Sequence, residues 1–179
     1  MEQHSAIQFR EQLEVMRVQM HQWVDTRFDA VLNSVNGNPN VYPQYPITTS
    51  ILKGRKPLAL CMPDGREIAV TTWKQVVTAI MKDCNQNKHC RQMLQKMCGK
   101  VWGKSRIILD DKSDRLDVPL KIDDQIFMEG KFDTESLIRV MTRRILDEVG
   151  YDYSQIWVKC RESKFDEMHL SPLPEDGQE

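Results

Sequence analysis

The clearest alternation of apolar and polar positions covers residues 126–160 and predicts a strand, a helix and a second strand. Residues 126–128 and 156–158 are short apolar runs, each typical of a strand. Between them, apolar residues recur at helical spacing: Leu137, Ile138, Met141, Ile145, Leu146 and Val149. Asp133 suits the N-cap of this helix and Gly150 its end. A helix of about four turns with one apolar face needs a sheet to cover it, and the two flanking strands are the nearest candidates.

The pattern upstream of this region is that of a mixed domain. Residues 58–62 and 67–70 predict a hairpin, because Pro63-Asp64-Gly65-Arg66 between them is a turn sequence. Helices are predicted over residues 72–82 and 87–98, a strand over 105–109 and an edge strand over 116–120. The predicted class is α+β, with one small and mostly antiparallel sheet packed with three helices.

The N-terminal segment predicts one long helix, because residues 5–35 contain no proline or glycine. Its apolar positions follow a heptad-like stripe, consisting of Leu13, Met16, Met20, Trp23, Val24, Phe28 and Val31. Such a stripe must be covered, either by the chain's own domain or by the same helix of a second copy in a homodimer. The expected division is a long helix over 1–36, which can form a coiled coil, a proline-rich linker over 37–48, an α+β domain over 49–162 and an acidic disordered tail over 163–179.

The composition is that of a globular chain with nearly balanced charge: 179 residues, 25 basic and 26 acidic. Five cysteines without a CxxC pair favour a reducing compartment. No apolar run approaches the roughly 18 residues that span a bilayer, and the first residues do not resemble a signal peptide, so the expected location is the cytoplasm. Residues 82–106 carry seven basic residues and one acidic residue, whereas residues 110–135 carry nine acidic and four basic residues.

The basic segment is the strongest functional signal in the sequence. It consists of Lys82, Lys88, Arg91, Lys96, Lys100, Lys104 and Arg106, with Trp102 among them. These cations predict contacts with the phosphates of nucleic acid, or with a partner, and the indole ring offers a surface for base stacking. The alternative is a solvated helix face with no binding function.

Catalytic and metal-binding patterns are weaker. Asp111, Glu129 and Lys131 match loosely the D…ExK arrangement of metal-dependent nucleases, although a solvated turn and strand end explain the same residues. Cys84, His89, Cys90 and Cys98 could form a zinc set, but the spacing of the cysteines fits no zinc knuckle, so free thiols are expected. The stretch GKVWGKS leads from a helix into a strand, which is the reverse of a phosphate-binding loop. We therefore expect no catalytic residue, metal or cofactor.

Two stretches, PLALCMPDGREIAVTTWKQVV and FMEGKFDTESLIRVMTRRILDEVGYDYSQIWV, together resemble a known domain. It is an uncharacterised accessory-protein domain of Firmicutes phages and other mobile elements, and the resemblance covers residues 57–160. Such accessory proteins include inhibitors of RNA-guided CRISPR nucleases, the anti-CRISPR proteins, and the resemblance implies that the cytoplasm in question is that of a bacterial host cell. The matching motifs are structural, so the resemblance implies a fold and a context but assigns no site residue.

These observations leave three functional hypotheses. The first is a non-catalytic accessory protein of a phage or mobile element that binds a macromolecular partner. Its most specific form is an anti-CRISPR protein that inhibits an RNA-guided nuclease and binds nucleic acid weakly. The second is a DNA-binding accessory or regulatory protein that dimerises through the N-terminal helix and contacts double-stranded DNA. A metal-dependent nuclease is a distant third. No membrane partner is expected.

Overall fold

The computed structural model describes residues 42–48 and 52–161 and, before them, residues 13, 16–18, 20–21, 24–25 and 28. The first elements are β1 (Gln44–Pro46), β2 (Lys56–Cys61) and β3 (Glu67–Ala69), followed by α2 (Trp73–Gln86) and α3 (Lys88–Met97). Next come β4 (Leu109–Asp110), a 3₁₀ turn (Ser113–Arg115), β5 (Pro119–Lys121) and β6 (Phe127–Glu129). The last elements are α4 (Thr134–Met141), a π-helical turn (Thr142–Leu146), α5 (Asp147–Val149) and β7 (Trp157–Arg161).

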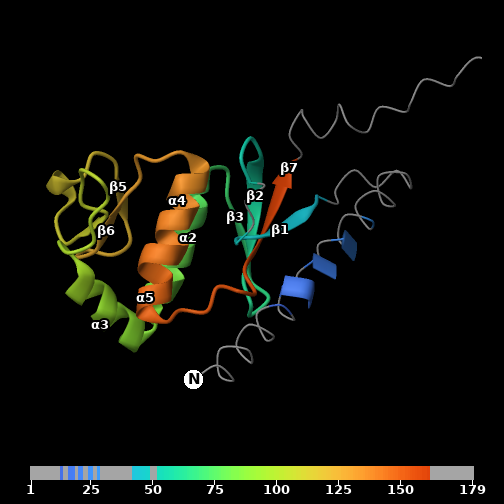
Figure 1. Ribbon diagram of the computed structural model, residues 1–179, viewed down its shortest axis with the longest axis horizontal. Helices are drawn as coiled ribbons and strands as arrows, with labels where there is room; N and C mark the ends of the chain where they lie inside the picture. The colour runs from blue at the N-terminus through green and yellow to red at the C-terminus, as the bar shows by residue number, and fades with distance from the viewer. Residues whose placement is uncertain are drawn as a thin grey trace, which may run out of the picture.

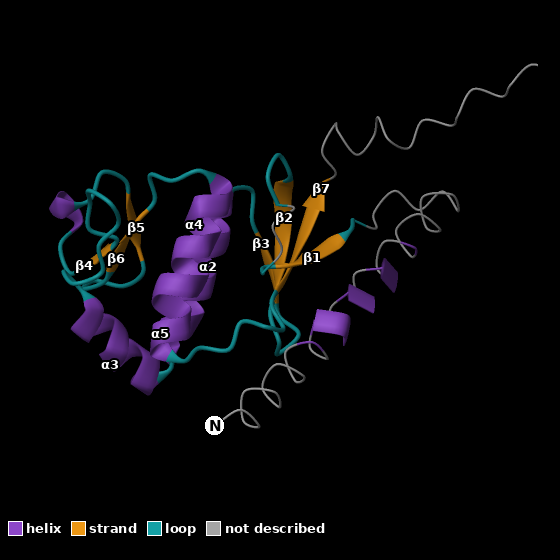
Figure 2. Ribbon diagram, in the orientation of Figure 1, coloured by secondary structure: helices purple, strands orange, loops and turns teal. Residues whose placement is uncertain are grey.

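The strands form two separate antiparallel sheets. One has the order β1-β7-β2-β3 and the other the order β4-β6-β5. The helices α2 and α4 lie between the two sheets, with the three-stranded sheet on the left and the four-stranded sheet on the right of Figure 1, and Figure 2 shows the same layers by element type. Helix α2 contacts both β2 and β5, so a single helix layer serves two sheets.

The sequence explains the limits of the helices. The side chain of Thr72 accepts a hydrogen bond from the amide of Gln75, and Gln75 in turn accepts from the amide of Thr71, which together cap the start of α2. Asn87 ends α2 and begins α3, because its side chain accepts from the amides of His89 and Cys90. Local polar side chains therefore satisfy the free amides at both helix starts.

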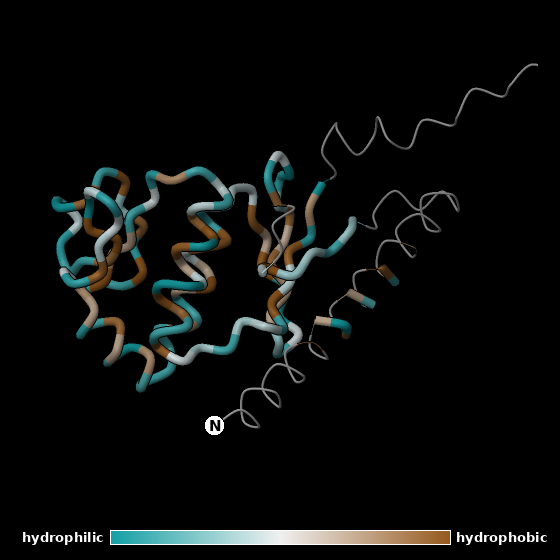
Figure 3. The backbone as a smooth tube through the Cα atoms, in the orientation of Figure 1, coloured by the Kyte–Doolittle hydropathy of each residue, from teal (hydrophilic) through white to brown (hydrophobic). Residues whose placement is uncertain are grey.

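The segment from α4 to α5 is one continuous helical stretch, as its apolar spacing predicted. The carboxylate of Asp133 accepts from the amide of Ser136 at its start, and Gly150 adopts a left-handed φ of 68° at its end. The buried side chains are Leu137, Ile138, Met141, Ile145, Leu146 and Val149. Figure 3 shows hydrophobic and hydrophilic residues alternating around its turns. The apolar face fixes which side of α4 remains exposed.

The predicted architecture is wrong in two respects, although the mixed class itself holds. There are two antiparallel sheets where one was expected, and the described elements include no long N-terminal helix. The third helix predicted for the domain is present but is divided into α4, the π-helical turn and α5. The strands on either side of α4, which were expected to share a sheet, belong to different sheets. The hydropathy pattern shows which faces are buried but not which element covers each face. It therefore cannot tell whether the strands form one sheet or two.

The linker prediction also missed a strand. Gln44–Pro46 forms β1 and pairs with β7, with Tyr45 opposite Val158. The Tyr45 side chain is fully buried, and the guanidinium of Arg55 lies 4.6 Å from the centre of its ring. Prolines at the ends of a short edge strand are tolerated where the missing N–H group is not needed, and the carbonyl of Pro43 still accepts a hydrogen bond from the amide of Cys160 at 3.0 Å. The rest of the linker, residues 37–41, and the predicted tail, residues 163–179, lie outside the described residues.

Within the part of the chain that the structure describes, no helix combines the length and apolar character needed to cross a membrane.

We predict that Tyr45→Ala lowers the free energy of unfolding by about 3–5 kcal/mol, as for other large aromatic residues truncated in a core. Tyr42→Ala is the matched control, because Tyr42 is only half-buried, and its cost is expected to stay below about 1 kcal/mol. Urea unfolding followed by circular dichroism measures both. Equal and small effects would mean that the segment behaves as a linker.

Candidate nucleic-acid interface

A basic groove of about 600 Å³ lies between α4 and the loop that leads into β4. Its walls come from three parts of the chain: residues 103–108, the connection from β6 to α4, and the exposed face of α4 with the π-helical turn. Among the described residues, six cationic side chains line it and no carboxylate does: Lys104, Arg106, Lys131, Arg139, Arg143 and Arg144. We call this feature the basic groove.

Helical periodicity places the arginines on the wall of the basic groove. Ser136, Val140 and Arg144 follow one another at intervals of four residues, and Arg139 and Arg143 lie beside them. The opposite face of the same helix is the buried apolar face. The hydroxyl of the buried Thr142 donates to the carbonyl of Ile138 at 2.9 Å where the π-helical turn begins. π-Helical turns are rare and often occur at functional sites.

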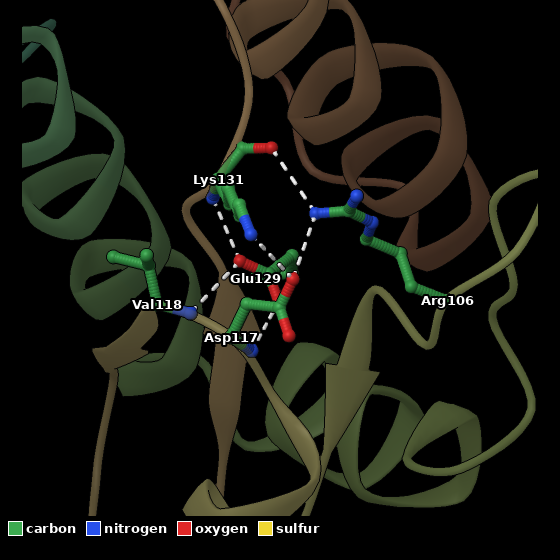
Figure 4. A network of polar contacts seen from close by, with 5 residues as sticks. All are labelled: Arg106, Asp117, Val118, Glu129 and Lys131. Carbon is green, nitrogen blue, oxygen red and sulfur yellow. Dashed lines mark hydrogen bonds and ion pairs between the residues drawn. The ribbon is translucent and has the colours of Figure 1, made fainter.

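Glu129, at the end of β6, fixes the second wall. Its side chain is 1% exposed, and its carboxylate accepts three backbone hydrogen bonds: from Asp117 at 2.7 Å, Val118 at 3.1 Å and Lys131 at 2.7 Å (Figure 4). A buried carboxylate is stable only when such donors replace its hydration. Glu129 therefore joins the segment before β5 to the segment after β6 and sets where their side chains point.

Asp117 connects two cations of the groove. Its Oδ2 atom lies 3.2 Å from Arg106 and 3.1 Å from the Nζ atom of Lys131 (Figure 4). Arg106 also donates to the carbonyl oxygen of Lys131 at 3.5 Å. Asp117 is about half exposed, so these ion pairs are partly screened by water. The carboxylate occupies the position between two cations that an external anion would also favour.

Trp102 lies next to the groove on the loop that precedes β4. Its ring nitrogen donates to the carbonyl of Gly99 at 3.2 Å, and its own carbonyl accepts from Arg144 at 2.9 Å. A backbone bridge to Ile107 and a hydrogen bond from Gly103 to Arg106 close the loop. Trp102 is 52% exposed although the loop around it is held in place.

The charge of the basic groove is only partly balanced. Asp117 pairs with Arg106 and Lys131, and Asp147 lies 3.5 Å from Arg143. Against six cations these two carboxylates leave about four positive charges. No hydrogen bond or ion pair to another described residue is found for the side chains of Lys104 and Arg139, and both are exposed. The groove can therefore attract a multivalent anion.

The structure brings together only part of the predicted basic segment. Lys104 and Arg106 line the basic groove, and Trp102 adjoins it. The other predicted residues lie on α2, on α3 or just after α3 and line no part of it: Lys82, Lys88, Arg91, Lys96 and Lys100. Arg91 forms an ion pair with Asp123 at 3.4 Å.

Four groove residues were missed as anion-binding residues: Lys131, Arg139, Arg143 and Arg144. Lys131 was instead assigned to a nuclease pattern. The arginines lie more than thirty positions beyond the basic segment, so a search along the chain does not join them to it. The sequence did show that the predicted helix has basic residues on one face and apolar residues on the other. This pattern is the same for a face that only contacts water and for a face that binds a ligand, so it could not identify the site.

The nuclease arrangement is not supported by the position of its central carboxylate. Both oxygens of Glu129 are held by backbone amides, and the Nζ atom of Lys131 pairs with Asp117. Asp111 is exposed after β4. Among the residues that the structure describes, no group of three or more His, Cys, Asp or Glu side chains is placed to hold a metal ion.

The cysteines are free thiols. Burial raises the pKa of Cys84 and Cys160, and burial together with Asp111 raises the pKa of Cys98 to about 11. Thiols held in the neutral form are poor nucleophiles and poor metal ligands.

The predicted dimerisation stripe is described only in part. Leu13, Met16, Met20, Val24 and Phe28 are between 36% and 66% exposed, whereas Trp23 and Val31 lie outside the described residues. The exposed apolar side chains are compatible with an additional contact. Dimerisation stays a prediction, and sedimentation of the full chain tests it.

Comparisons with protein-family models, with curated proteins and with solved structures found no match for this chain.

We predict that Glu129→Gln destabilises the protein by about 2–4 kcal/mol, because an amide offers its NH₂ group to amides that need an acceptor. Glu148→Gln is the control: Glu148 is exposed on α5, and its replacement is expected to change stability by less than about 0.5 kcal/mol. Urea unfolding measures the difference. A neutral Glu129→Gln variant would mean that the three hydrogen bonds do not support the groove.

Proposed function

We propose that this chain is a non-catalytic binding protein that holds nucleic acid by its phosphates in the basic groove. The observation that carries the proposal is the convergence of six cations from three separate segments on one concavity without a lining carboxylate among the described residues. Solvated lysines and arginines normally have acidic neighbours or point apart, so this convergence favours binding over a solvated face. Phosphate contacts of this kind give affinity without sequence specificity.

The resemblance to mobile-element accessory proteins supports a narrower form of the proposal, in which the bound nucleic acid belongs to an RNA-guided nuclease. In that form the chain inhibits the nuclease by holding its guide or its target strand in the basic groove. The other route, in which acidic side chains imitate phosphates in the channel of the nuclease, has less support from the geometry, because five of the nine carboxylates in the acidic segment are buried or paired. Asp110 and Glu129 are buried, and Asp117, Asp123 and Asp124 form ion pairs. The other four are exposed: Asp111, Asp114, Asp133 and Glu135.

The buried Asp110 shows why this segment is a poor imitation of a phosphate backbone. Burial raises the pKa of its carboxyl, but the amide of Lys112 and the guanidinium of Arg115 outweigh burial and hold the pKa below its ordinary value. The charge is therefore retained but is directed at the protein itself, with Arg115 at 3.5 Å. A partner cannot reach it.

We predict that Lys104→Glu with Arg139→Glu lowers affinity for nucleic acid at least tenfold. The slope of log affinity against log salt should also fall by about one for each phosphate that the variant no longer binds. Neither side chain has a partner among the described residues, so folding should be unaffected. Fluorescence anisotropy with labelled nucleic acid at several salt concentrations measures both quantities.

The matched control for this pair is Lys96→Glu with Lys100→Glu, which changes the net charge equally outside the basic groove. It should retain most of the affinity. If both double variants lose binding equally, bulk charge or the α3 region carries the interaction instead of the groove. Absence of binding by the unmodified protein would contradict the proposed function.

We also predict that Asp117→Asn increases affinity by about threefold to tenfold, because it removes a carboxylate that competes with phosphate for Arg106 and Lys131. Asp124→Asn is the control, since Asp124 pairs only with Lys121 among the described residues. The same anisotropy titration gives both values. An unchanged or weakened affinity in the Asp117 variant would show that phosphate does not take the position of this carboxylate.

A further inference from the structure

The lining of the basic groove is not purely cationic. Between its charged side chains lie the buried Ile108 and the half-buried Phe132 and Val140, so the floor is apolar. The phosphates of a duplex lie on the outside of a thick rod whose bases are stacked inside. A duplex therefore has no group to place on an apolar floor, whereas an unpaired base does.

Trp102 does not line the basic groove itself, but it directly precedes the lining residue Gly103 and offers an exposed aromatic surface on the same loop. Among residues 42–48 and 52–161 it is the only large hydrophobic side chain that is exposed. Its ring is held by the hydrogen bond to Gly99, and its backbone is held by Arg144, a groove residue. A fixed and exposed indole loses little side-chain freedom when a base stacks on it.

A second cavity lies on the other side of α4 and shares two residues with the basic groove. It measures about 260 Å³, and its described lining includes Ile47, Leu52 and Tyr153, one carboxylate, Glu135, and the arginines Arg139 and Arg143. The hydroxyl of Tyr153 donates to the carboxylate of Asp147 at 2.7 Å, which orients its ring. The two shared arginines thus stand between two partly apolar cavities, each of which contains an aromatic ring.

This arrangement also argues against reading of a duplex by α4. On one side of α4, residues 103–108 form the opposite wall of the basic groove. On the other side, residues near β1 and β2 form the opposite wall of the second cavity. A recognition helix must instead project from its neighbours to enter a major groove about 8.5 Å deep. A flexible single strand can follow a concave surface that a rigid duplex cannot enter.

We propose that the basic groove selects single-stranded over double-stranded nucleic acid, with phosphates at Arg139 and Arg143 and an unstacked base against Trp102 and the apolar floor. This inference rests on the proposed function, because it specifies the class of nucleic acid that the same groove binds. It differs from the sequence-based expectation of double-stranded DNA.

The test separates the contribution of bases from that of phosphates. The probes are a labelled oligothymidylate of about 12 nucleotides, a strand of equal length in which every base is replaced by a tetrahydrofuran spacer, and a duplex of equal length. The full chain is titrated with each probe by anisotropy at one salt concentration. We expect oligothymidylate to bind about tenfold more tightly than either the spacer strand or the duplex.

Variants of Trp102 and of the groove cations show which residues cause the difference in affinity between the probes. Trp102→Ala should weaken binding of oligothymidylate about fivefold and leave the spacer strand unchanged, whereas Trp102→Phe should retain most of the affinity. Lys104→Glu with Arg139→Glu should weaken both strands, because both carry the same phosphates. Unchanged urea midpoints confirm that each variant is folded.

Three outcomes would overturn the inference. Equal binding of oligothymidylate and the spacer strand would show that the groove reads phosphates alone, and the proposed function would stand. Tighter binding of the duplex would show that the groove does not select single strands, again with the proposed function intact. A weaker affinity of Trp102→Ala for the spacer strand would show that the ring supports the loop and does not stack on bases. Absence of binding by all three probes would refute the proposed function itself.

Discussion

The buried carboxylate of Glu129 is the interaction on which the geometry of the groove depends. It is almost inaccessible to water, and three backbone amides from two segments donate to it. Gly130 tightens the same junction, because a Cβ atom there would lie 2.9 Å from the side chain of Leu120. The chain between β6 and α4 is thus confined on both sides. Lys131 and Phe132 follow directly, so their place in the groove is a consequence of this confinement.

The same junction explains how cations can gather without destabilising the fold. Like charges repel, and a cluster of six cations is tolerated only if the backbone that carries them is stabilised elsewhere. Here the stability comes from the apolar faces of α2 and α4 between the two sheets and from the hydrogen-bonded network around Glu129. Asp117 and Asp147 reduce the repulsion further. The remaining charge is available to a ligand, which is the physical basis of the proposed function.

Much of the local structure could be predicted from the sequence. The hairpin of β2 and β3, the helices α2 and α3 and the long segment ending at Gly150 all follow from spacing, caps and turn residues. The strand predicted over 105–109 is reduced to Leu109–Asp110 and one bridge, because the loop around Trp102 closes on itself. β1 could not be recognised, since its pairing with β7 joins residues more than a hundred positions apart and the two residues between Pro43 and Pro46 are too few to show a period.

The candidate site was predictable only in part, and the reason is physical. The sequence by itself determined which residues are cationic, which helix face is apolar and which side chains cap each helix, because these depend on neighbours within a few positions. Tertiary structure alone decided that Lys104 and Arg106 meet Arg139, Arg143 and Arg144, and that Glu129 is surrounded by amides and not by solvent. It also decided that the strands flanking α4 belong to two sheets. Such contacts depend on long-range packing, which brings together segments whose local patterns contain no information about one another.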